Sequence, residues 1–424
     1  MSHFGIVAPA FQSHFHAFQA LGSELIDRGH RVTFFQQADA RRWVSDPRSG
    51  FRALGALSHP PGCLAAVLRR AATSNNPLRL RGVLHDLCAS IQMLCRELPQ
   101  ALTLAGIDAL LCDQMEAAGG LVAEALDVPF ISVACALPVN REPQLPLAVM
   151  PFAYATDERS QRLYQGSQRV YDWLMHPLGD VIRDACRHLA ITPRDGLHQC
   201  LSPYAQISQT ISGFDLPRQQ MPATFHAVGP LRTPGQQWAG EWLIDATRPF
   251  VIASLGTLQG GRMSMFRQIA KACARLDAQL MVAHCGGLDP AQQARLQHSG
   301  AIWVVDFAPQ QWVLAKADAV VTHGGLNTVM DALKARTPML VMPIGFDQPG
   351  VAARVCHAGV GLALNRRARA RSIHDALVRL LAHLAEPLHR LAAQLNEAGG
   401  TPRAADIIEK VVRTGRPVPA ETTP

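Results

Sequence analysis

Short apolar runs alternate with segments of helical spacing along most of the chain. The first apolar run covers residues 4–8 and is closed by Pro9, a stretch with helical spacing ends near Arg28, and a second apolar run covers 31–35. A strand, a loop, a helix and a strand within about 30 residues form the building unit of a doubly wound parallel sheet. The same alternation predicts strands at 107–113, 130–134, 250–255, 280–284, 302–305, 319–321 and 339–342, with helices at 117–126, 171–189, 263–276, 326–334, 373–385 and 401–412.

Two domains account for this pattern better than one, because 424 residues are long for a single core. We expect an N-terminal domain over 1–230 and a C-terminal domain over 249–400. Residues 231–248 are polar with proline and glycine and read as a linker. A final helix at 401–414 and a tail at 415–424 complete the chain.

Composition excludes several classes of protein. Apolar residues make up 48% of the chain, which argues against disorder. The net charge of +7 comes with only two short arginine groups, near residues 69–81 and 366–371. A solvated basic surface explains them, attraction to an anionic membrane is the alternative, and a nucleic-acid binder would cluster more charge.

Motifs for resident cofactors and for export are missing from the sequence. The ten cysteines include no C-x-x-C pair, so neither a zinc site nor a redox pair is predicted. The first strand lacks G-x-G-x-x-G, which disfavours nicotinamide and flavin cofactors. Without a signal peptide or an apolar run of about 20 residues, the sequence predicts a cytoplasmic protein. Peripheral contact with the inner face of the membrane stays open.

Residues 319–334 form a predicted anion site. An apolar strand ends at Thr322, His323 opens a glycine turn that includes Gly325, and a helix follows with Asn327 and Thr328 in its first turn. Unpaired N–H groups and the helix dipole favour a phosphate at such a helix start, and glycine lets it approach the backbone.

Two acidic positions near this anion site suit a sugar. Asp331 lies one helical turn after the glycine turn and could accept hydrogen bonds from sugar hydroxyls. The strand at 339–342 delivers Asp347 and Gln348, and a carboxylate beside an amide supplies acceptors and donors for a polyol. Together these groups predict a nucleotide-sugar pocket.

His14 and Asp113 are the candidate pair for acid–base chemistry. His14 lies in a predicted loop where the first strand passes to the first helix, and Asp113 ends the strand at 107–113. Both fall on the carboxyl edge, where doubly wound sheets bind ligands. A carboxylate there can orient an imidazole and stabilise its protonated form. A structural or solvated histidine and a helix-capping aspartate are the alternatives, and His16 is the weaker histidine candidate.

The C-terminal half resembles the donor site of the GT-B UDP-sugar-dependent glycosyltransferases. That family has a W-A-P-Q element, then H-C-G-x-N-S/T-x-x-E, then D-Q. This chain has the three elements in the same order, at 307–310, 323–331 and 347–348. It departs from the pattern at Phe307 and Leu326, where the family has tryptophan, and at Asp331, a shorter acid.

The resemblance implies two Rossmann-like domains facing each other across a cleft. It implies an inverting, metal-independent transfer from UDP-glucose as co-substrate, with no cofactor. His14 would be the general base, Asp113 its partner, and Gln348 would favour glucose. The implied donor-binding residues are Ser254, Gly256, Thr257, Phe307, Gln310, His323, Gly325, Asn327, Thr328, Asp331, Asp347 and Gln348.

The acceptor is implied by a second resemblance. The stretches at 29–37, 132–143, 225–232 and 253–260 are similar to bacterial carotenoid glycosyltransferases. The implied acceptor is a carotenoid diol, zeaxanthin, which would become its β-glucoside and then its diglucoside. The proline-broken apolar segment at 138–155 would line the acceptor cleft, or else pack as a surface loop.

Other functions remain open at this point. A GT-B enzyme for a sterol, macrolide or phenolic acceptor would share the donor residues. A non-catalytic nucleotide-sugar-binding partner protein would typically lack the pair of His14 and Asp113.

Overall fold

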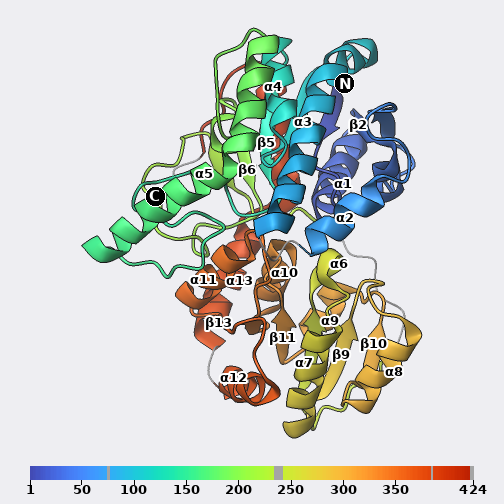
Figure 1. Cartoon of the computed structure of the whole chain (residues 1–424), viewed down its shortest axis with the longest axis vertical. Helices are drawn as coiled ribbons and strands as arrows, with labels where there is room; N and C mark the ends of the chain where they lie inside the picture. Colours follow the sequence, from blue (N-terminus) through green and yellow to red (C-terminus); the bar gives the residue numbers. More distant parts are fainter. Residues whose placement is uncertain (74–76, 234–241, 383–384, 421–424) are drawn as a thin grey trace.

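Two parallel α/β domains face each other in the structure, which is a computed structural model (Figure 1). It describes residues 1–73, 77–233, 242–382 and 385–420. Part of the predicted linker (234–241), two residues near the end of the helix expected at 373–385 (383–384) and the end of the tail (421–424) lie outside the described residues.

The first sheet has the strand order β3-β2-β1-β4-β5-β6-β7, and every pair of neighbours is parallel. Its described strands are β1 (His3–Val7), β2 (Arg31–Gln37), β3 (Gly50–Leu54), β4 (Ala109–Asp113), β5 (Phe130–Ala134), β6 (Gln206–Ser208) and β7 (Phe225–Ala227). β1, β4 and β5 are buried at every residue, as expected for central strands covered on both faces.

Helices cover both faces of the first sheet. They are α1 (Gln12–Asp27), α2 (Leu64–Ala72), α3 (Pro77–Ala105), α4 (Ala117–Ala125) and α5 (Glu158–His188), with short 3-10 turns η1 (Ala38–Trp43) and η2 (Leu197–Gln199). Alternate residues of β4 enter different cores, because successive side chains of a strand point to opposite faces. Leu111 packs on the α1 side and Leu110 on the side of α3, α4 and α5.

The second sheet has the order β10-β9-β8-β11-β12-β13, again with parallel neighbours. Its described strands are β8 (Phe250–Ser254), β9 (Gln279–Ala283), β10 (Trp303–Val305), β11 (Ala319–Thr322), β12 (Met339–Val341) and β13 (Gly361–Ala363). The accompanying helices are α6 (Gly256–Gln259), α7 (Met263–Arg275), α8 (Pro290–His298), α9 (Gln310–Lys316), α10 (Leu326–Ala335), α11 (Gln348–His357), α12 (Ala370–Ala382) and α13 (Ala385–Glu397).

The last helix, α14 (Gly400–Thr414), packs on the first domain rather than on the second. Its apolar residues Ala404, Ile408 and Val411 enter the core that contains Phe4 and Phe18. On its outer side, Arg28 of α1 binds Asp406 at 2.6 Å and Glu409 at 2.8 Å.

Two segments differ from the sequence prediction in length or type. α5 begins at Glu158, well before the predicted start at residue 171. The prediction missed this first half because its apolar residues are exposed and form no buried stripe. The expected loop around His14 is wrong, since α1 begins at Gln12 and the N–H of His14 bonds to the carbonyl of Phe11 at 3.1 Å. The segment 138–155 is irregular, as predicted.

Candidate active site

A cavity of about 1150 Å³ lies between the two domains. The first domain contributes the start of α1, parts of α2, α3 and α5, and residues from the irregular segment. The second domain contributes the loops that follow β8, β11 and β12. All of these loops leave the carboxyl edges of parallel sheets, where such folds bind ligands.

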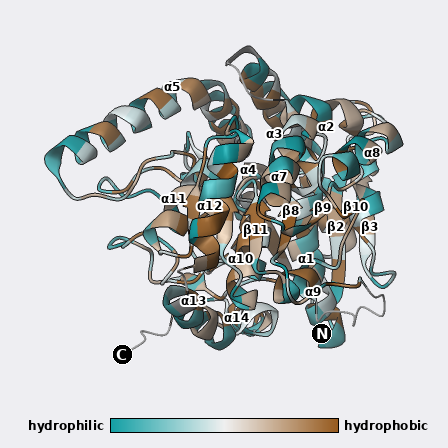
Figure 2. Cartoon of the chain, turned by 90° about the horizontal axis from the view of Figure 1, so that it is seen from below, coloured by the Kyte–Doolittle hydropathy of each residue, from teal (hydrophilic) through white to brown (hydrophobic). Residues whose placement is uncertain are grey.

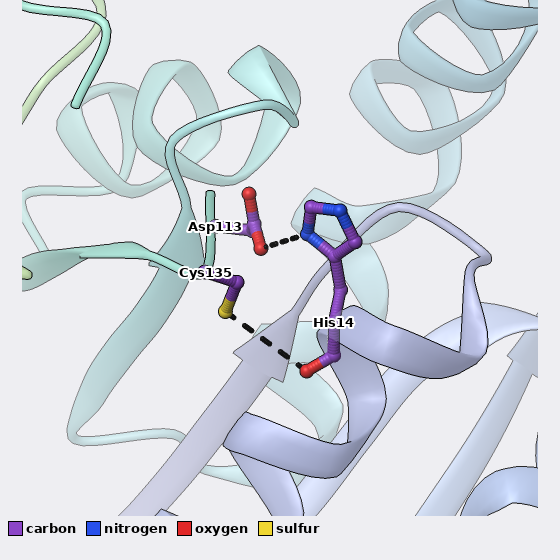
Figure 3. A group of neighbouring side chains, drawn as sticks. All are labelled: His14, Asp113 and Cys135. Carbon is purple, nitrogen blue, oxygen red and sulfur yellow. Dashed lines mark hydrogen bonds and ion pairs between the residues drawn. The ribbon is translucent and has the colours of Figure 1, made fainter. Parts of the chain in front are cut away.

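His14 and Asp113 meet on the first-domain side of this cavity (Figure 3). β1 pairs with β4 so that Val7 lies opposite Cys112, which brings the turn into α1 beside Asp113. His14 Nδ1 lies 2.6 Å from Asp113 Oδ2. The other carboxylate oxygen accepts from the N–H of Met115 at 2.8 Å, so the buried carboxylate is fixed in place. His14 lines the cavity and Asp113 supports it from behind.

The electrostatic setting of His14 suits a proton acceptor. Burial alone would lower the pKa of His14, but the charge and hydrogen bond of Asp113, together with the charge of Asp347, outweigh it and raise the pKa. With Nδ1 held by the carboxylate, Nε2 is the nitrogen left to take a proton from a ligand. The pair therefore has the geometry of a general base with its orienting acid.

The loops after β8 and β11 form an anion cradle, a polar surface on the opposite side of the cavity from His14. Because Thr322 lies opposite Ser254 in the pairing of the two strands, the residues that follow each strand are neighbours. A Cβ added to Gly256 would lie 2.6 Å from Cε1 of His323, and a Cβ added to Gly325 would lie equally close. The imidazole of His323 therefore fits only between two glycines, and Gly256 also has a positive φ of 72°.

This cradle can bind an anion without a full positive charge. Burial lowers the pKa of His323 to about 4, so its imidazole is neutral and can donate a hydrogen bond. α10 begins after Gly325 with no side-chain cap, and its first-turn N–H groups are available to a ligand. The predicted residues that line the cavity here are Ser254, Gly256, Thr257, His323, Gly325, Asn327 and Thr328.

Of the residues expected near the base and ribose, Phe307 and Gln310 line the cavity and Asp331 does not. Phe307 is 62% exposed, as a stacking platform for a ligand would be. Gln310 donates to Asp331 Oδ2 at 2.6 Å, and Arg232 donates to Asp331 Oδ1 at 2.9 Å. Both carboxylate oxygens of Asp331 are thus occupied by protein donors, and its contact with a sugar stays a prediction.

Asp347 and Gln348 lie where α11 begins, on the same cavity. Burial raises the pKa of Asp347. The hydrogen bond that its carboxylate accepts from the N–H of Leu137, at 3.2 Å, and the charge of His14 act in the opposite direction. Gln348 Oε1 accepts from the N–H groups of Ile344 and Gly345 at 2.9 Å each, which leaves its amide NH₂ to donate to a ligand.

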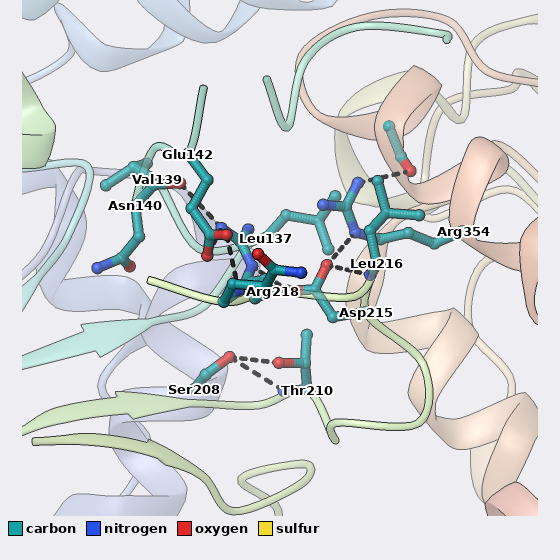
Figure 4. A network of polar contacts seen from close by, with 12 residues as sticks. Leu137, Val139, Asn140, Glu142, Ser208, Thr210, Asp215, Leu216, Arg218 and Arg354 are labelled. Carbon is teal, nitrogen blue, oxygen red and sulfur yellow. Dashed lines mark hydrogen bonds and ion pairs between the residues drawn. The ribbon is translucent and has the colours of Figure 1, made fainter. Parts of the chain in front are cut away.

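Sequence reasoning missed the polar contacts that join the two domains. Arg232 donates to Gln209 of the first domain at 2.8 Å, and Asn327 donates to the carbonyl of Ser13 at 3.2 Å. Further along the interface, Asp215 accepts from Arg354 of α11 at 2.6 Å (Figure 4). No local pattern marks these residues, because their partners lie 23, 314 and 139 positions away in the chain.

The rest of the cavity belongs to the first domain, where apolar side chains lie beside charged ones such as Arg69, Arg183 and Asp195. Its apolar lining includes Leu68, Val83, Leu87, Met115, Leu147, Met175 and Leu178. Leu147 belongs to the segment at 138–155, which therefore reaches the cavity. Arg141 and Asp172 also line it and form an ion pair at 2.8 Å. The apolar side chains of this lining suit an apolar ligand.

Similarity to known proteins agrees with this geometry. The family model described as UDP-glucoronosyl and UDP-glucosyl transferase matches residues 66–384. A zeaxanthin glucosyltransferase of Pantoea ananas is 47% identical over 423 residues, which cover 99% of this chain and 98% of the relative. One of Pseudescherichia vulneris is 46% identical over 418 residues, covering 97% and 98%.

Solved structures share the fold. The glycosyltransferase of kitacinnamycin superposes with a TM-score of 0.75 at 22% identity, covering 97% of this chain and 99% of the other. The calicheamicin glycosyltransferase superposes with a TM-score of 0.72 at 21% identity, covering 98% and 100%. The expected GT-B fold is therefore confirmed. In the described parts of the chain, no helix has both the length and the apolar character needed to cross a bilayer.

Proposed function

This chain belongs to the UDP-glucoronosyl and UDP-glucosyl transferase family, and from that premise we propose that it transfers glucose from UDP-glucose to the hydroxyl groups of zeaxanthin. The products are the β-glucoside and then the diglucoside. The observation that carries the proposal is the pair of His14 and Asp113, 2.6 Å apart on a cavity whose other wall is an anion cradle. The acceptor rests on the two relatives, both named zeaxanthin glucosyltransferase, that align over nearly the whole chain.

In the proposed reaction, His14 Nε2 takes the proton of the acceptor hydroxyl as its oxygen attacks the anomeric carbon. The bond from that carbon to the diphosphate breaks on the opposite face, so the configuration inverts. Asp113 stabilises the imidazolium that forms. His323 and the N–H groups at the start of α10 meet the charge that develops on UDP. These donors support a transfer that needs no metal ion.

The sugar and nucleotide are assigned to the remaining predicted residues. Asp347 and Gln348 bind sugar hydroxyls, and Asp347 exchanges its bond with Leu137 for one to the sugar. Phe307 stacks on uracil, and Gln310 contacts the ribose. Asp331 acts by holding Gln310 and Arg232 in position, and reaches the ribose only if those contacts open.

We assign one substrate to each domain. Residues 1–230 bind the acceptor and residues 249–400 bind the donor. Residues 231–248 join the domains, and the helix at 401–414 returns to the first domain before a tail at 415–424. The apolar lining from α2, α3 and α5 supports the acceptor assignment.

The reaction is tested with purified protein, detergent-dispersed zeaxanthin and UDP-glucose, with EDTA present and no added metal. We expect mono- and diglucosides, identified by chromatography and mass. If UDP-glucose binds but no product forms, the acceptor is another apolar alcohol, such as a sterol, macrolide or phenol. If UDP-glucose does not bind, the donor assignment is wrong as well.

We also propose that the first half of α5 contacts the membrane surface. α5 projects from the body of the molecule (Figure 2), and its Leu163, Val170 and Trp173 are 49%, 56% and 73% exposed. Arg162 and Arg169 are exposed beside them, although Arg162 also pairs with Glu158. Exposed tryptophan and aliphatic side chains with arginine are typical of helices that lie in a lipid interface. The acceptor, an apolar rod, is also a molecule that dissolves in bilayers.

Vesicle flotation tests this contact. Wild-type protein should float with vesicles that contain an anionic lipid, and Trp173→Glu with Val170→Glu should abolish flotation while glucosylation of detergent-dispersed zeaxanthin continues. Each arginine near an anionic surface contributes about 1 kcal/mol, so salt should weaken the binding. Equal flotation of both proteins, or none by the wild type, would rule out this surface.

A further inference from the structure

His14, Asp113 and Cys135 form a cluster of three potential metal ligands (Figure 3). One ligand atom from each residue lies within 4.8 Å of the others. Asp113 ends β4 and Cys135 directly follows β5, and these two strands are neighbours in the sheet. Two of the three residues therefore come from adjacent strand ends and the third, His14, from the first turn of α1, so no short spacing along the sequence marks the cluster.

We propose that this cluster is an inhibitory site for a soft divalent cation such as Zn²⁺. Nitrogen, sulfur and carboxylate oxygen are the ligands that zinc prefers, at about 2.0–2.3 Å. Ligands around a tetrahedral zinc are then roughly 3.3–3.7 Å apart. For zinc to bind, the 2.6 Å distance between His14 Nδ1 and Asp113 Oδ2 has to increase by about 1 Å or less. The Sγ of Cys135 has to move toward these two atoms by a similar amount.

The surroundings of Cys135 allow this adjustment. Cys135 lines the cavity, so an ion can reach its thiol without unfolding the domain. Its Sγ makes a long contact, 3.9 Å, to the carbonyl of His14, and it also interacts with the carboxylate of Asp113. Three protein ligands leave a fourth position for water on the cavity side, as in open zinc sites.

Metal binding would disable His14 through its tautomer. The proposal rests here on the proposed role of His14 as the general base. A metal on Nδ1 uses that nitrogen's lone pair, so the proton that Nδ1 shares with Asp113 moves to Nε2. The thiol of Cys135 loses its proton to solvent as the thiolate binds. Nε2 then carries a proton and cannot accept one from the acceptor hydroxyl, and Asp113 no longer stabilises an imidazolium.

The test compares Cys135→Ala with a matched control, Cys285→Ala. Cys285 also lines the cavity but lies in the second domain, after β9. Zinc affinity is measured by competition with a chromophoric chelator, and turnover is measured in zinc buffers relative to each protein's zinc-free rate. Wild type and Cys285→Ala should bind one zinc and lose turnover over the same range. Cys135→Ala should bind at least ~10-fold more weakly, the smallest loss expected when a metal site loses a supporting group.

Cobalt provides a readout that does not depend on activity. Co²⁺ bound at this site should give a thiolate charge-transfer band that is present in wild type and absent in Cys135→Ala. Equal zinc inhibition of Cys135→Ala and wild type, or no thiolate band in wild type, would overturn the site. Zinc bound through Cys135 without loss of turnover would overturn the inhibition. Absence of glucosylation activity would leave the zinc and cobalt measurements unaffected.

Discussion

Replacing His14 with alanine should lower the rate of glucosyl transfer by about 10²–10⁴-fold, the usual contribution of a positioned general base. The acceptor hydroxyl would have to lose its proton to water, because the Nε2 acceptor is gone. UDP-glucose should still bind, since the anion cradle lies in the loops after β8 and β11. Turnover with saturating UDP-glucose and UDP-glucose affinity by calorimetry measure the two effects separately.

His16→Ala is the matched control for this change. His16 lies on the same helical turn, and burial, followed by the charge of Arg232, lowers its pKa, so it lacks the carboxylate support of His14. The His16→Ala variant should therefore lose far less transfer activity than His14→Ala. Asp113→Asn should keep the shape of the site but remove the charge that stabilises the imidazolium, and therefore reduce turnover rather than donor affinity. Loss of UDP-glucose binding in His14→Ala would instead show that His14 is structural.

Replacing Asp215 with alanine should destabilise the protein by about 3–5 kcal/mol, because it leaves a buried guanidinium without its partner. Arg354 is 1% exposed and donates to Asp215 at 2.6 Å, and Arg218 donates to the same carboxylate at 2.6 Å (Figure 4). Burial would raise the pKa of Asp215, but Arg354 and Arg218 hold it below its usual value. Urea unfolding of the two proteins measures the difference.

A double variant and an exposed ion pair serve as controls. Asp215→Leu with Arg354→Met removes both charges, so it should recover much of the lost stability. Asp27→Ala breaks the contact of Arg48 with Asp27, whose side chains are 51% and 61% exposed, and should cost at most about 1 kcal/mol. If Asp215→Ala costs no more than Asp27→Ala, the buried pair does not stabilise the domain interface.

The local parts of the fold and site could be predicted because their causes are local. The apolar run at 319–321 and the glycines after it predicted β11, the turn and α10 nearly to the residue. His14 and Asp113 could be paired because both follow strands of one parallel sheet, whose carboxyl ends share an edge. The fold is confirmed, and the roles of the site residues stay predictions.

What could not be predicted depends on how the two domains pack. Asp331 has the expected place on α10, but its carboxylate binds Arg232, which lies 99 positions away. Arg354 reads as an ordinary surface residue of a helix, yet the first domain buries it against Asp215. The start of α5 was missed for another reason, because exposed Leu163, Val170 and Trp173 break the usual pattern of a buried stripe.

The return of α14 to the first domain has a consequence for building hybrid enzymes. A donor domain cannot be exchanged as one terminal block, because the first domain's core is completed by Ile408 and Val411, which follow the second domain in the chain. Gly400 also bonds to the carbonyl of Val228 at 2.7 Å, so the chain crosses between domains at two adjacent points. A chimera therefore requires two junctions, one on each side of the exchanged domain, with α14 kept from the parent that supplies the acceptor site.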